Sequence, residues 1–371
     1  MEFRAATIAA LALSAACGGS PASSTDANIT DHPPPDDGAS SAGGTGGDAS
    51  HPGGAGGADG DAARPRYLAL GDSVAFGYNI EHKQYFADGT SKDLPDQTKH
   101  AIGYPEALVK MLDGGVAVAN TACPGEAAGS LVTGAHADDN DCYENRHIYP
   151  LHHEYDHQDY DFRDGTEDNA DNYGSGVSQL DHALAYLAEA PDRVKLVTIT
   201  MGANDAVKFS GAACNWAESL WDKGCLLSGT LDAVLNTVEE SWKTTLGALA
   251  EAGYQGPIVV VLYYSPGYRL TDLPMRTGIK LLNEQIHDAA EAVLAEYPSL
   301  DVRFVDSYEL FQSLSASFDD DPCKAGLTML MTQGPDAGQC DIHPSNLGEE
   351  HLAAEVWSSL GFDEQQALLA P

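Results

Sequence analysis

Four short segments of the chain carry groups that are suited to acyl transfer. In chain order they are Gly71–Ser73, Thr121–Glu126, Met201–Asp205 and Cys340–Pro344. Ser73 offers a hydroxyl nucleophile, His343 an imidazole base, and Asp341 a carboxylate that can orient this base. The two middle segments offer N–H donors for a developing oxyanion. Together the four segments contain the groups that acyl transfer through a serine requires.

The elements that must position these groups follow an alternating pattern. Short apolar, β-branched runs predict strands at Tyr67–Leu70, Val116–Asn120, Val194–Thr200, Ile258–Tyr263 and Val302–Val305. Helical periodicity predicts helices at Tyr104–Leu112, Val177–Ala190, Leu231–Ala252, Ile279–Tyr297 and Leu347–Leu360. Strands that alternate with helices favour an α/β fold, with a mainly parallel sheet covered on both faces. The first three chemical segments follow predicted strands, at the sheet edge where open α/β folds place their sites. We expect the fourth to open the last of these helices.

The ordered set of segments resembles the SGNH/GDSL family of serine esterases and lipases over about residues 66–361. The resemblance implies a flavodoxin-like three-layer α/β/α sandwich with a mainly parallel five-stranded sheet. It implies that Ser73 is the nucleophile and His343 the general base. It also implies an oxyanion hole formed by the backbone N–H groups of Ser73 and Gly125 and the side-chain amide of Asn204. No metal ion and no cofactor is implied.

The sequence departs from the family pattern at the acid. The family usually has Asp three residues before the His, and Cys340 occupies that position here, while Asp341 stands two residues before His343. Either Asp341 reaches the His343 ring, which we expect, or a backbone carbonyl orients the ring. Two further carboxylates, Asp72 and Asp205, are expected to hold turns rather than to take part in the chemistry.

The first 64 residues predict export and a flexible tether. The apolar run Ala5–Ala16 is too short to span a bilayer, and residues 1–17 resemble a lipoprotein signal in which Cys17 is acylated. A plain secretory signal is the alternative. Residues 18–64 are rich in Gly, Ala, Ser and Pro, which predicts a disordered linker to one hydrolase domain at 65–371. The expected location is extracellular or in the cell envelope, on the outer membrane if the source is Gram-negative.

The cysteines support an oxidising compartment. Once Cys17 is set aside, six remain, and six cysteines allow 15 connectivities, among which the sequence does not choose. Their spacing suggests three local pairs: Cys123–Cys142, Cys214–Cys225 and Cys323–Cys340.

The charge balance excludes some partners. The chain has 56 Asp and Glu residues against 19 Lys and Arg, a formal net charge of −37. Binding to nucleic acid or to an anionic lipid surface needs clustered basic residues, which this chain lacks. We therefore expect a monomer that meets an ester substrate, either a lipid or an acylated sugar, and meets a membrane only through its lipid anchor.

Two other functions remain open at this point. His153-Glu154-Tyr155-Asp156-His157 matches the zinc-metallopeptidase pattern. It lies in an acidic, His- and Tyr-rich insertion at 135–175, which has little helical periodicity, so a solvated loop is the favoured interpretation. The second alternative is a non-catalytic binding lipoprotein on a hydrolase scaffold. Intact Ser73 and His343 argue against it.

Overall fold

The computed structural model of the chain divides into two units, Met1–Gly54 and Ala55–Pro371, and every described residue belongs to the second. The described residues are 65–78, 83–85, 91–93, 102–113, 115–133, 178–189, 191–205, 230–269, 272–332 and 337–369. The predicted signal at 1–17, the linker at 18–64 and the insertion at 135–175 lie outside them.

A parallel five-stranded sheet forms the centre of this unit. Its strands are β1 (Arg66–Gly71), β4 (Ala117–Asn120), β5 (Val194–Thr200), β6 (Pro257–Val261) and β7 (Asp301–Val305). They pair in the order β4-β1-β5-β6-β7, and every pair is parallel. If the five are numbered along the chain, this order is 2-1-3-4-5, the flavodoxin-like arrangement. The five predicted strands and the α/β class are confirmed.

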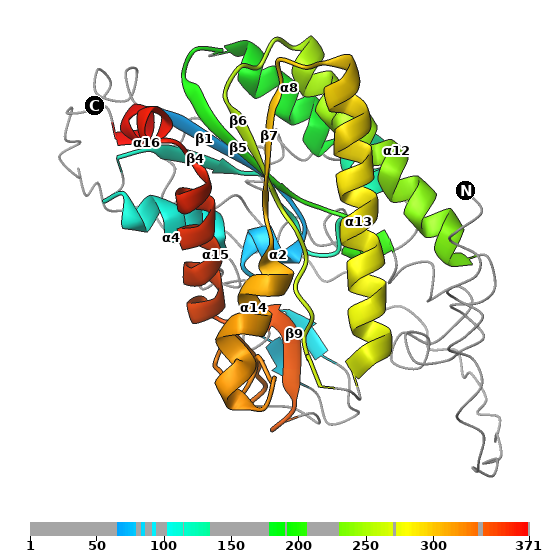
Figure 1. The fold of residues 1–371 in the computed structure, drawn as a ribbon. Helices are drawn as coiled ribbons and strands as arrows, with labels where there is room; N and C mark the ends of the chain where they lie inside the picture. The colour runs from blue at the N-terminus through cyan, green and yellow to red at the C-terminus, as the bar shows by residue number, and fades with distance from the viewer. Residues whose placement is uncertain are drawn as a thin grey trace, which may run out of the picture. The chain divides into compact units, whose positions relative to one another are not determined.

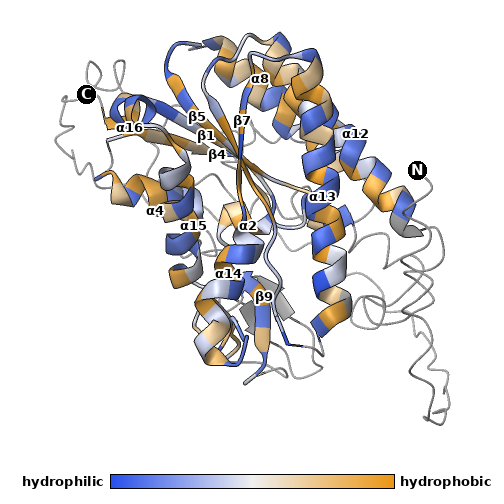
Figure 2. Cartoon of the chain, viewed as in Figure 1, coloured by the Kyte–Doolittle hydropathy of each residue, from blue (hydrophilic) through white to orange (hydrophobic). Residues whose placement is uncertain are grey.

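Helices cover both faces of the sheet. Helices α4 (Tyr104–Met111) and α15 (Asn346–Ser359) lie on one side, and α8 (Gln179–Glu189), α12 (Thr230–Glu251) and α13 (Leu273–Glu296) lie on the other (Figure 1). The strands are largely hydrophobic, whereas the helices carry hydrophobic and hydrophilic residues on different sides (Figure 2). This pattern is expected when strands are buried on both faces and each helix has one side in water. Each of the five predicted helices is present, and α13 begins at Leu273, before its predicted start at Ile279.

The smaller elements were not predicted. They are α2 (Ser73–Phe76), α5 (Ala128–Thr133), α14 (Ser307–Ser315), η3 (Ala316–Phe318), α16 (Phe362–Leu369) and two strand pairs, β2 (Lys83–Tyr85) with β3 (Ser91–Asp93) and β8 (Thr328–Leu330) with β9 (Cys340–Pro344). The pair β8–β9 corrects one expectation, because the segment of His343 forms a strand rather than the start of a helix. Proline disfavours the helical conformation in the residue that precedes it, so Pro344 keeps His343 extended. Helix α15 begins only after Ser345, whose side chain caps it.

The core continues to the sheet edge that carries the candidate site. The fully buried Trp242 of α12 donates its indole N–H to the carbonyl of Met201, directly after β5, at 3.2 Å. Near that edge Tyr104 of α4 bonds the hydroxyl of Thr200 at 3.0 Å. Helices on both faces therefore hold the end of the central strand in place. Among the described helices, none is both long and apolar enough to cross a lipid bilayer.

Candidate active site

Ser73 is the first residue of α2, immediately after β1. Asp72 caps this short helix, because its carboxylate accepts the backbone N–H of Val74 at 3.0 Å. The first N–H groups of a helix have no partner inside the helix, so that of Ser73 is available to a ligand. The Ser73 side chain is half-buried, at the carboxyl edge of the sheet. A nucleophile in this place can meet a substrate from outside the core.

Gly71 permits the sharp turn that leads to the nucleophile. Its φ is 150°, and a side-chain carbon built there would lie 2.4 Å from the carbonyl oxygen of Thr200. The Gln179 side chain then accepts the N–H of Gly71 at 3.0 Å and donates to its carbonyl at 2.9 Å. Close packing against β5 and a two-sided amide contact therefore hold the start of the turn.

His343 lies between Ser73 and Asp341. Its Nε2 is 3.0 Å from the Ser73 Oγ, and its Nδ1 is 2.5 Å from the Asp341 Oδ1. The same carboxylate oxygen accepts the backbone N–H of His343 at 2.9 Å. The Tyr78 ring packs against the imidazole with 4.8 Å between the ring centroids. This arrangement can remove a proton from the serine and hold the resulting imidazolium in place.

The strand that carries the imidazole is held from two sides. β9 pairs antiparallel with β8, and the Tyr264 hydroxyl donates to the backbone carbonyl of Ile342, between Asp341 and His343. At its end, the Ser345 hydroxyl accepts the N–H of Gly348 at 3.2 Å. Neighbouring elements therefore set the position of the base, which does not depend on a free loop.

Two of the three expected oxyanion donors, Gly125 and Asn204, stand on the loops that follow β4 and β5, the two neighbours of β1. Gly125 has a φ of 80°, a left-handed turn conformation that suits glycine. The Asn204 amide donates to the carbonyl of Glu126 at 3.0 Å, which brings the two loops together. Since an amide carries two N–H bonds, the second remains for another acceptor.

Two buried side chains beneath these loops were missed by the sequence analysis. The Glu126 carboxylate accepts from Gln179 at 2.9 Å and from the Ser130 hydroxyl. Close by, the Asp205 carboxylate accepts the backbone N–H of Ala128 at 2.7 Å, so Asp205 holds a turn as expected. Gln179 belongs to a helix far along the chain, and nothing in its sequence context indicated a contact with Glu126.

A comparison with protein families decides the identity of the chain. The model of the GDSL-like lipase/acylhydrolase family matches residues 67–356. The chain belongs to this family. It is a carboxylic ester hydrolase, and the resemblance predicted from the four segments is confirmed. No curated protein sequence matches the chain.

Several solved structures are similar to this GDSL hydrolase at low identity. The acetylxylan esterase Axe2 of Geobacillus stearothermophilus is 16% identical, with 81% of this chain and 95% of that chain covered at a TM-score of 0.41. A phospholipase A1 of Streptomyces albidoflavus NA297 is also 16% identical, with 80% and 100% covered at 0.41. At this distance neither structure indicates the substrate of this chain.

The acid residue next to the nucleophile of this GDSL hydrolase is buried and charged. Burial raises the pKa of Asp72 to about 6, while hydrogen bonds from Tyr263 and the Val74 N–H, and the charge of His343, act in the opposite direction. Tyr263 donates its hydroxyl to Asp72 at 2.5 Å. Asp72 is therefore largely ionised at neutral pH, beside the nucleophile. The sequence analysis had not connected Tyr263 with it.

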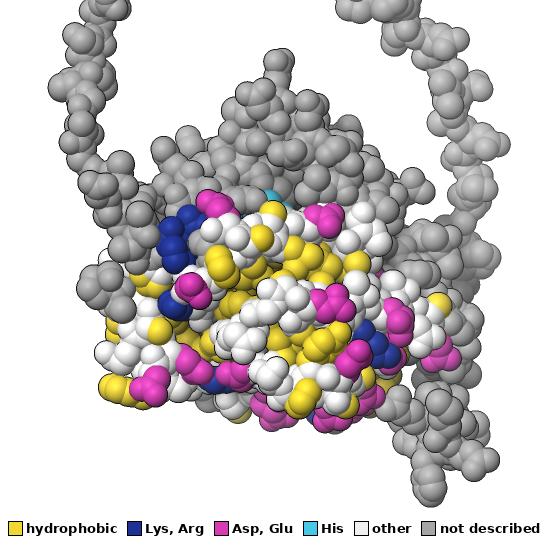
Figure 3. Space-filling model, turned by 90° about the horizontal axis from the view of Figure 1, so that it is seen from above, with side chains coloured by type: hydrophobic (Ala, Val, Ile, Leu, Met, Phe, Trp, Pro, Cys, Tyr) yellow, Lys and Arg dark blue, Asp and Glu magenta, His cyan; other side chains and the backbone are white. Residues whose placement is uncertain are grey.

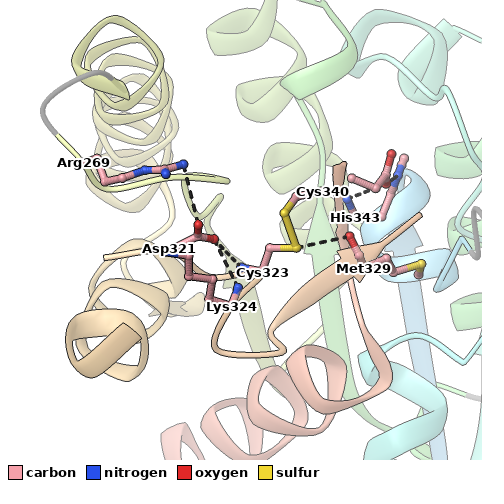
Figure 4. The surroundings of a disulfide bond; sticks show 8 residues. Arg269, Asp321, Cys323, Lys324, Met329, Cys340 and His343 are labelled. Atoms are coloured by element: carbon pink, nitrogen blue, oxygen red, sulfur yellow. Dashed lines mark hydrogen bonds and ion pairs between the residues drawn. A yellow bond between two sulfur atoms is a disulfide. The ribbon is translucent and has the colours of Figure 1, made fainter. Parts of the chain in front are cut away.

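A disulfide lies directly before the acid–base pair (Figure 4). Cys323 and Cys340 are bonded, as their spacing predicted, and Cys340 precedes Asp341 in β9. On the Cys323 side, the Asp321 carboxylate accepts the backbone N–H of Cys323 at 3.1 Å and lies 3.7 Å from the Arg269 guanidinium. The disulfide therefore connects β9, which carries His343, to a turn that the ion pair between Asp321 and Arg269 stabilises.

The remaining predicted sites fall largely outside the described residues. These are Cys17, Cys142, His153, Glu154, His157, Cys214 and Cys225. Cys123 is described and is disulfide-bonded, while its predicted partner Cys142 lies outside the described residues. Within those ranges, one group of side chains has the spacing of metal ligands, Asp321 with Cys323 and Cys340, and its two sulfur atoms are bonded to each other.

Proposed function

We propose that the chain hydrolyses esters of lipids or acylated carbohydrates through an acyl-enzyme on Ser73. The observation that carries this proposal is the contact of 3.0 Å between the Ser73 Oγ and the His343 Nε2, with Asp341 on the other ring nitrogen. A nucleophile, its base and an orienting carboxylate in hydrogen-bond reach are the signature of covalent catalysis by serine.

In the first half of the reaction, His343 takes the hydroxyl proton as the Ser73 Oγ attacks the ester carbonyl. The new C–O bond places a negative charge on the former carbonyl oxygen. The N–H groups of Ser73 and Gly125 and the amide of Asn204 are the donors for this charge. In comparable sites, the loss of one such donor costs about 2.7–4 kcal/mol.

The C–O bond to the leaving alcohol then breaks, and the alcohol takes the proton from His343, which leaves the acyl-enzyme. In the second half, a water molecule gives a proton to His343 and attacks the acyl carbonyl. The bond between the acyl carbon and the Ser73 Oγ then breaks, the acid is released, and His343 returns the proton to Ser73. Asp341 stays ionised throughout and stabilises the imidazolium that forms in each half.

A fluorophosphonate probe and a panel of esters test the proposal. The wild type should be labelled and should cleave at least one of a short-chain nitrophenyl ester, a phospholipid and an acetylated sugar. Ser73→Ala should lose both labelling and hydrolysis. Activity that persists in this variant and disappears with a chelator would favour a metallopeptidase instead. A wild type that cleaves no ester would favour a binding lipoprotein.

We further propose that the enzyme is exported and tethered to a membrane by an acylated Cys17. The support is the apolar run at residues 5–16 that ends in small residues before Cys17, and the Gly-rich segment after it. Metabolic labelling with an alkyne fatty acid should mark the full chain and should not mark Cys17→Ser. Equal labelling of both would refute the anchor without affecting the esterase proposal.

A further inference from the structure

We propose that Tyr263 is a positioning residue for the reaction, which holds the nucleophile turn through Asp72 beside the loop that carries Asn204. This inference rests on the proposed role of Ser73. It assigns a function to a side chain that lies beyond the end of β6 and belongs to none of the four chemical segments.

The first contact joins Tyr263 to the nucleophile turn. The Tyr263 hydroxyl donates to one carboxylate oxygen of Asp72 at 2.5 Å, and the other oxygen accepts the N–H of Val74 at 3.0 Å. Asp72 is 1% exposed and Tyr263 5% exposed, so water does not compete for this bond. Because Ser73 lies between Asp72 and Val74, which the second of these bonds joins, a shift of the carboxylate moves the nucleophile.

The second neighbour of the Tyr263 hydroxyl is the loop that carries Asn204. The backbone N–H of Ala203 lies near this hydroxyl and acts to lower its pKa, against the larger effect of burial. Ala203 directly precedes Asn204, the expected side-chain donor. One hydroxyl thus donates to the turn after β1 and faces the loop after β5. A shift of this tyrosine would change the position of the nucleophile relative to an oxyanion donor, and small errors in such positions slow catalysis strongly.

The backbone of Tyr263 is held by helix α13. The Asn283 side chain of α13 accepts the N–H of Tyr263 at 3.0 Å and donates to its carbonyl at 2.8 Å. Tyr263 is two residues past the last residue of β6, so the strand ladder does not satisfy these backbone groups. The paired amide contact gives the tyrosine a single defined position.

The contact also has an electrostatic consequence. Several groups act on Asp72 or respond to its charge: Tyr263, His343, Asp205, Tyr104, Tyr264 and Glu349. The Tyr263 hydrogen bond lowers the pKa of Asp72, which burial raises to about 6. The carboxylate charge that it preserves attracts the imidazolium that forms at His343 during the reaction. Without Tyr263, Asp72 holds its proton to a higher pH, and this attraction is lost over the same range.

The test is the Tyr263→Phe variant, with kcat and KM measured from about pH 5 to 9. Because the lost hydrogen bond is to a charged group, we expect kcat to fall about 10-fold or more near pH 6–7, with KM nearly unchanged. The loss should shrink at high pH, where Asp72 is ionised in both proteins. The acidic limb of the profile should therefore move to higher pH.

Tyr254→Phe is the matched control. Tyr254 is also buried, at 5% exposed, and its hydroxyl donates to the carbonyl of Pro257 at 3.3 Å. Pro257 is the first residue of β6, at the other end of the strand from the site. Its removal should lower the melting temperature without changing the pH profile. An equal, pH-independent loss of activity in both variants would overturn the proposal, because that result is what a purely structural tyrosine gives.

A second pair of variants shows whether Tyr263 acts through Asp72. Asp72→Asn keeps an acceptor for the Val74 N–H but cannot ionise, so the acidic inflection due to Asp72 should disappear. Adding Tyr263→Phe to it should then change kcat far less than in the wild type. Full additivity of the two losses, or a wild-type profile for Tyr263→Phe, would overturn the proposal. In all these variants labelling of Ser73 by the fluorophosphonate tests the proposed function separately.

Discussion

The carboxylate of this GDSL hydrolase stands two residues before the histidine, and the local backbone explains why this spacing works. His343 lies on β9, and side chains two apart on a strand point to the same side. Asp341 therefore shares the side of His343, while Cys340 and Ile342 share the opposite side. A carboxylate three residues before the histidine would point away from the ring on such a strand. The spacing of two residues between Asp341 and His343 is therefore the one that the strand conformation of this segment requires.

We expect Asp341→Asn to lower kcat by roughly 10²- to 10⁴-fold, because the amide cannot hold the imidazole in the same tautomer or stabilise its positive charge. Steady-state kinetics on a nitrophenyl ester measure the effect. Asp319→Asn is the control, since Asp319 pairs with Lys324 on the exposed surface at 2.8 Å. Near-normal kcat in Asp341→Asn would mean that a backbone carbonyl suffices to orient the ring.

At the scale of elements, the strand pair β8–β9 depends on its disulfide. The bond between Cys323 and Cys340 closes a segment with a separation of 17 residues, and a loop of this size is worth about 3 kcal/mol in the chain-entropy description. β9 lies outside the main sheet and has only β8 as a partner in the described structure. The cross-link is therefore a principal restraint on the strand that carries Asp341 and His343.

We expect the double variant Cys323→Ser/Cys340→Ser to unfold at a lower temperature. We also expect its kcat to fall by a larger factor than its KM rises. The reason is that β9 then samples positions in which His343 is out of reach of Ser73. Cys340 is exposed, so mild reductant should impair the wild type in the same way. The double variant should show no further response at those reductant concentrations. Unchanged kcat together with a lower melting temperature would limit the bond to a stabilising role.

Helix α15 carries a buried carboxyl group of a different kind. Glu349 is 1% exposed, and neither oxygen has a hydrogen-bond partner of good geometry in the described part of the chain. Burial raises its pKa well above the ordinary value, helped by the charges of Glu106 and Asp72, while the Tyr104 N–H offsets part of this. The folded chain therefore retains a proton that the unfolded chain releases.

This retained proton predicts a dependence of stability on pH. The contribution of Glu349 is fully present below its unfolded-state pKa and is lost as pH rises toward its folded-state pKa. Glu349→Gln should remove this loss, so its melting temperature should fall less than that of the wild type between about pH 5 and pH 8. Glu350→Gln, the exposed neighbour on the same helix, should follow the wild type. Identical pH curves for all three would contradict the interpretation.

The elements that could be predicted are those with a clear hydrophobic pattern. Strands such as Pro257–Val261 are continuous apolar runs, and helices such as Thr230–Glu251 have a long amphipathic period. β9 has neither signal, because Asp341 and His343 interrupt any apolar run and its partner strand β8 is only three residues long. Local sequence therefore suggested a helix start where a strand exists.

The site could be predicted in part for a similar reason. Ser73, Asn204 and His343 stand in short segments whose order is informative. Tyr263 and Gln179 act through contacts with residues more than 100 positions away, and a tyrosine after an apolar run has the pattern of an ordinary core residue. Such contacts depend on the strand order, which brings β1, β4, β5 and β6 to one edge and which no local pattern contains.

At the scale of the whole molecule, the dominant feature is the net charge of −37. On the face seen in Figure 3, acidic side chains surround a hydrophobic centre, and basic side chains are few. Charges of one sign on a compact surface repel each other, which destabilises the folded state relative to an expanded chain. Ion pairs such as that of Lys243 with Glu239 at 2.6 Å cannot balance this repulsion, because the chain has only 19 Lys and Arg residues for 56 Asp and Glu residues.

We expect added salt to stabilise the protein for this reason. The screening length falls from about 30 Å at 0.01 M to about 3 Å at 1 M ionic strength, so repulsion between surface carboxylates is largely removed over this range. The melting temperature should rise by several degrees in sodium chloride, and choline chloride of equal ionic strength should act alike if screening is the cause. A calcium salt that is effective at much lower ionic strength would instead indicate specific cation binding.

Hydrolysis of an uncharged nitrophenyl ester should change little across the series, because neither the substrate nor its approach to Ser73 depends on the surface field. A melting temperature that falls or stays constant with salt would show that the surface charges are already too far apart to destabilise the fold.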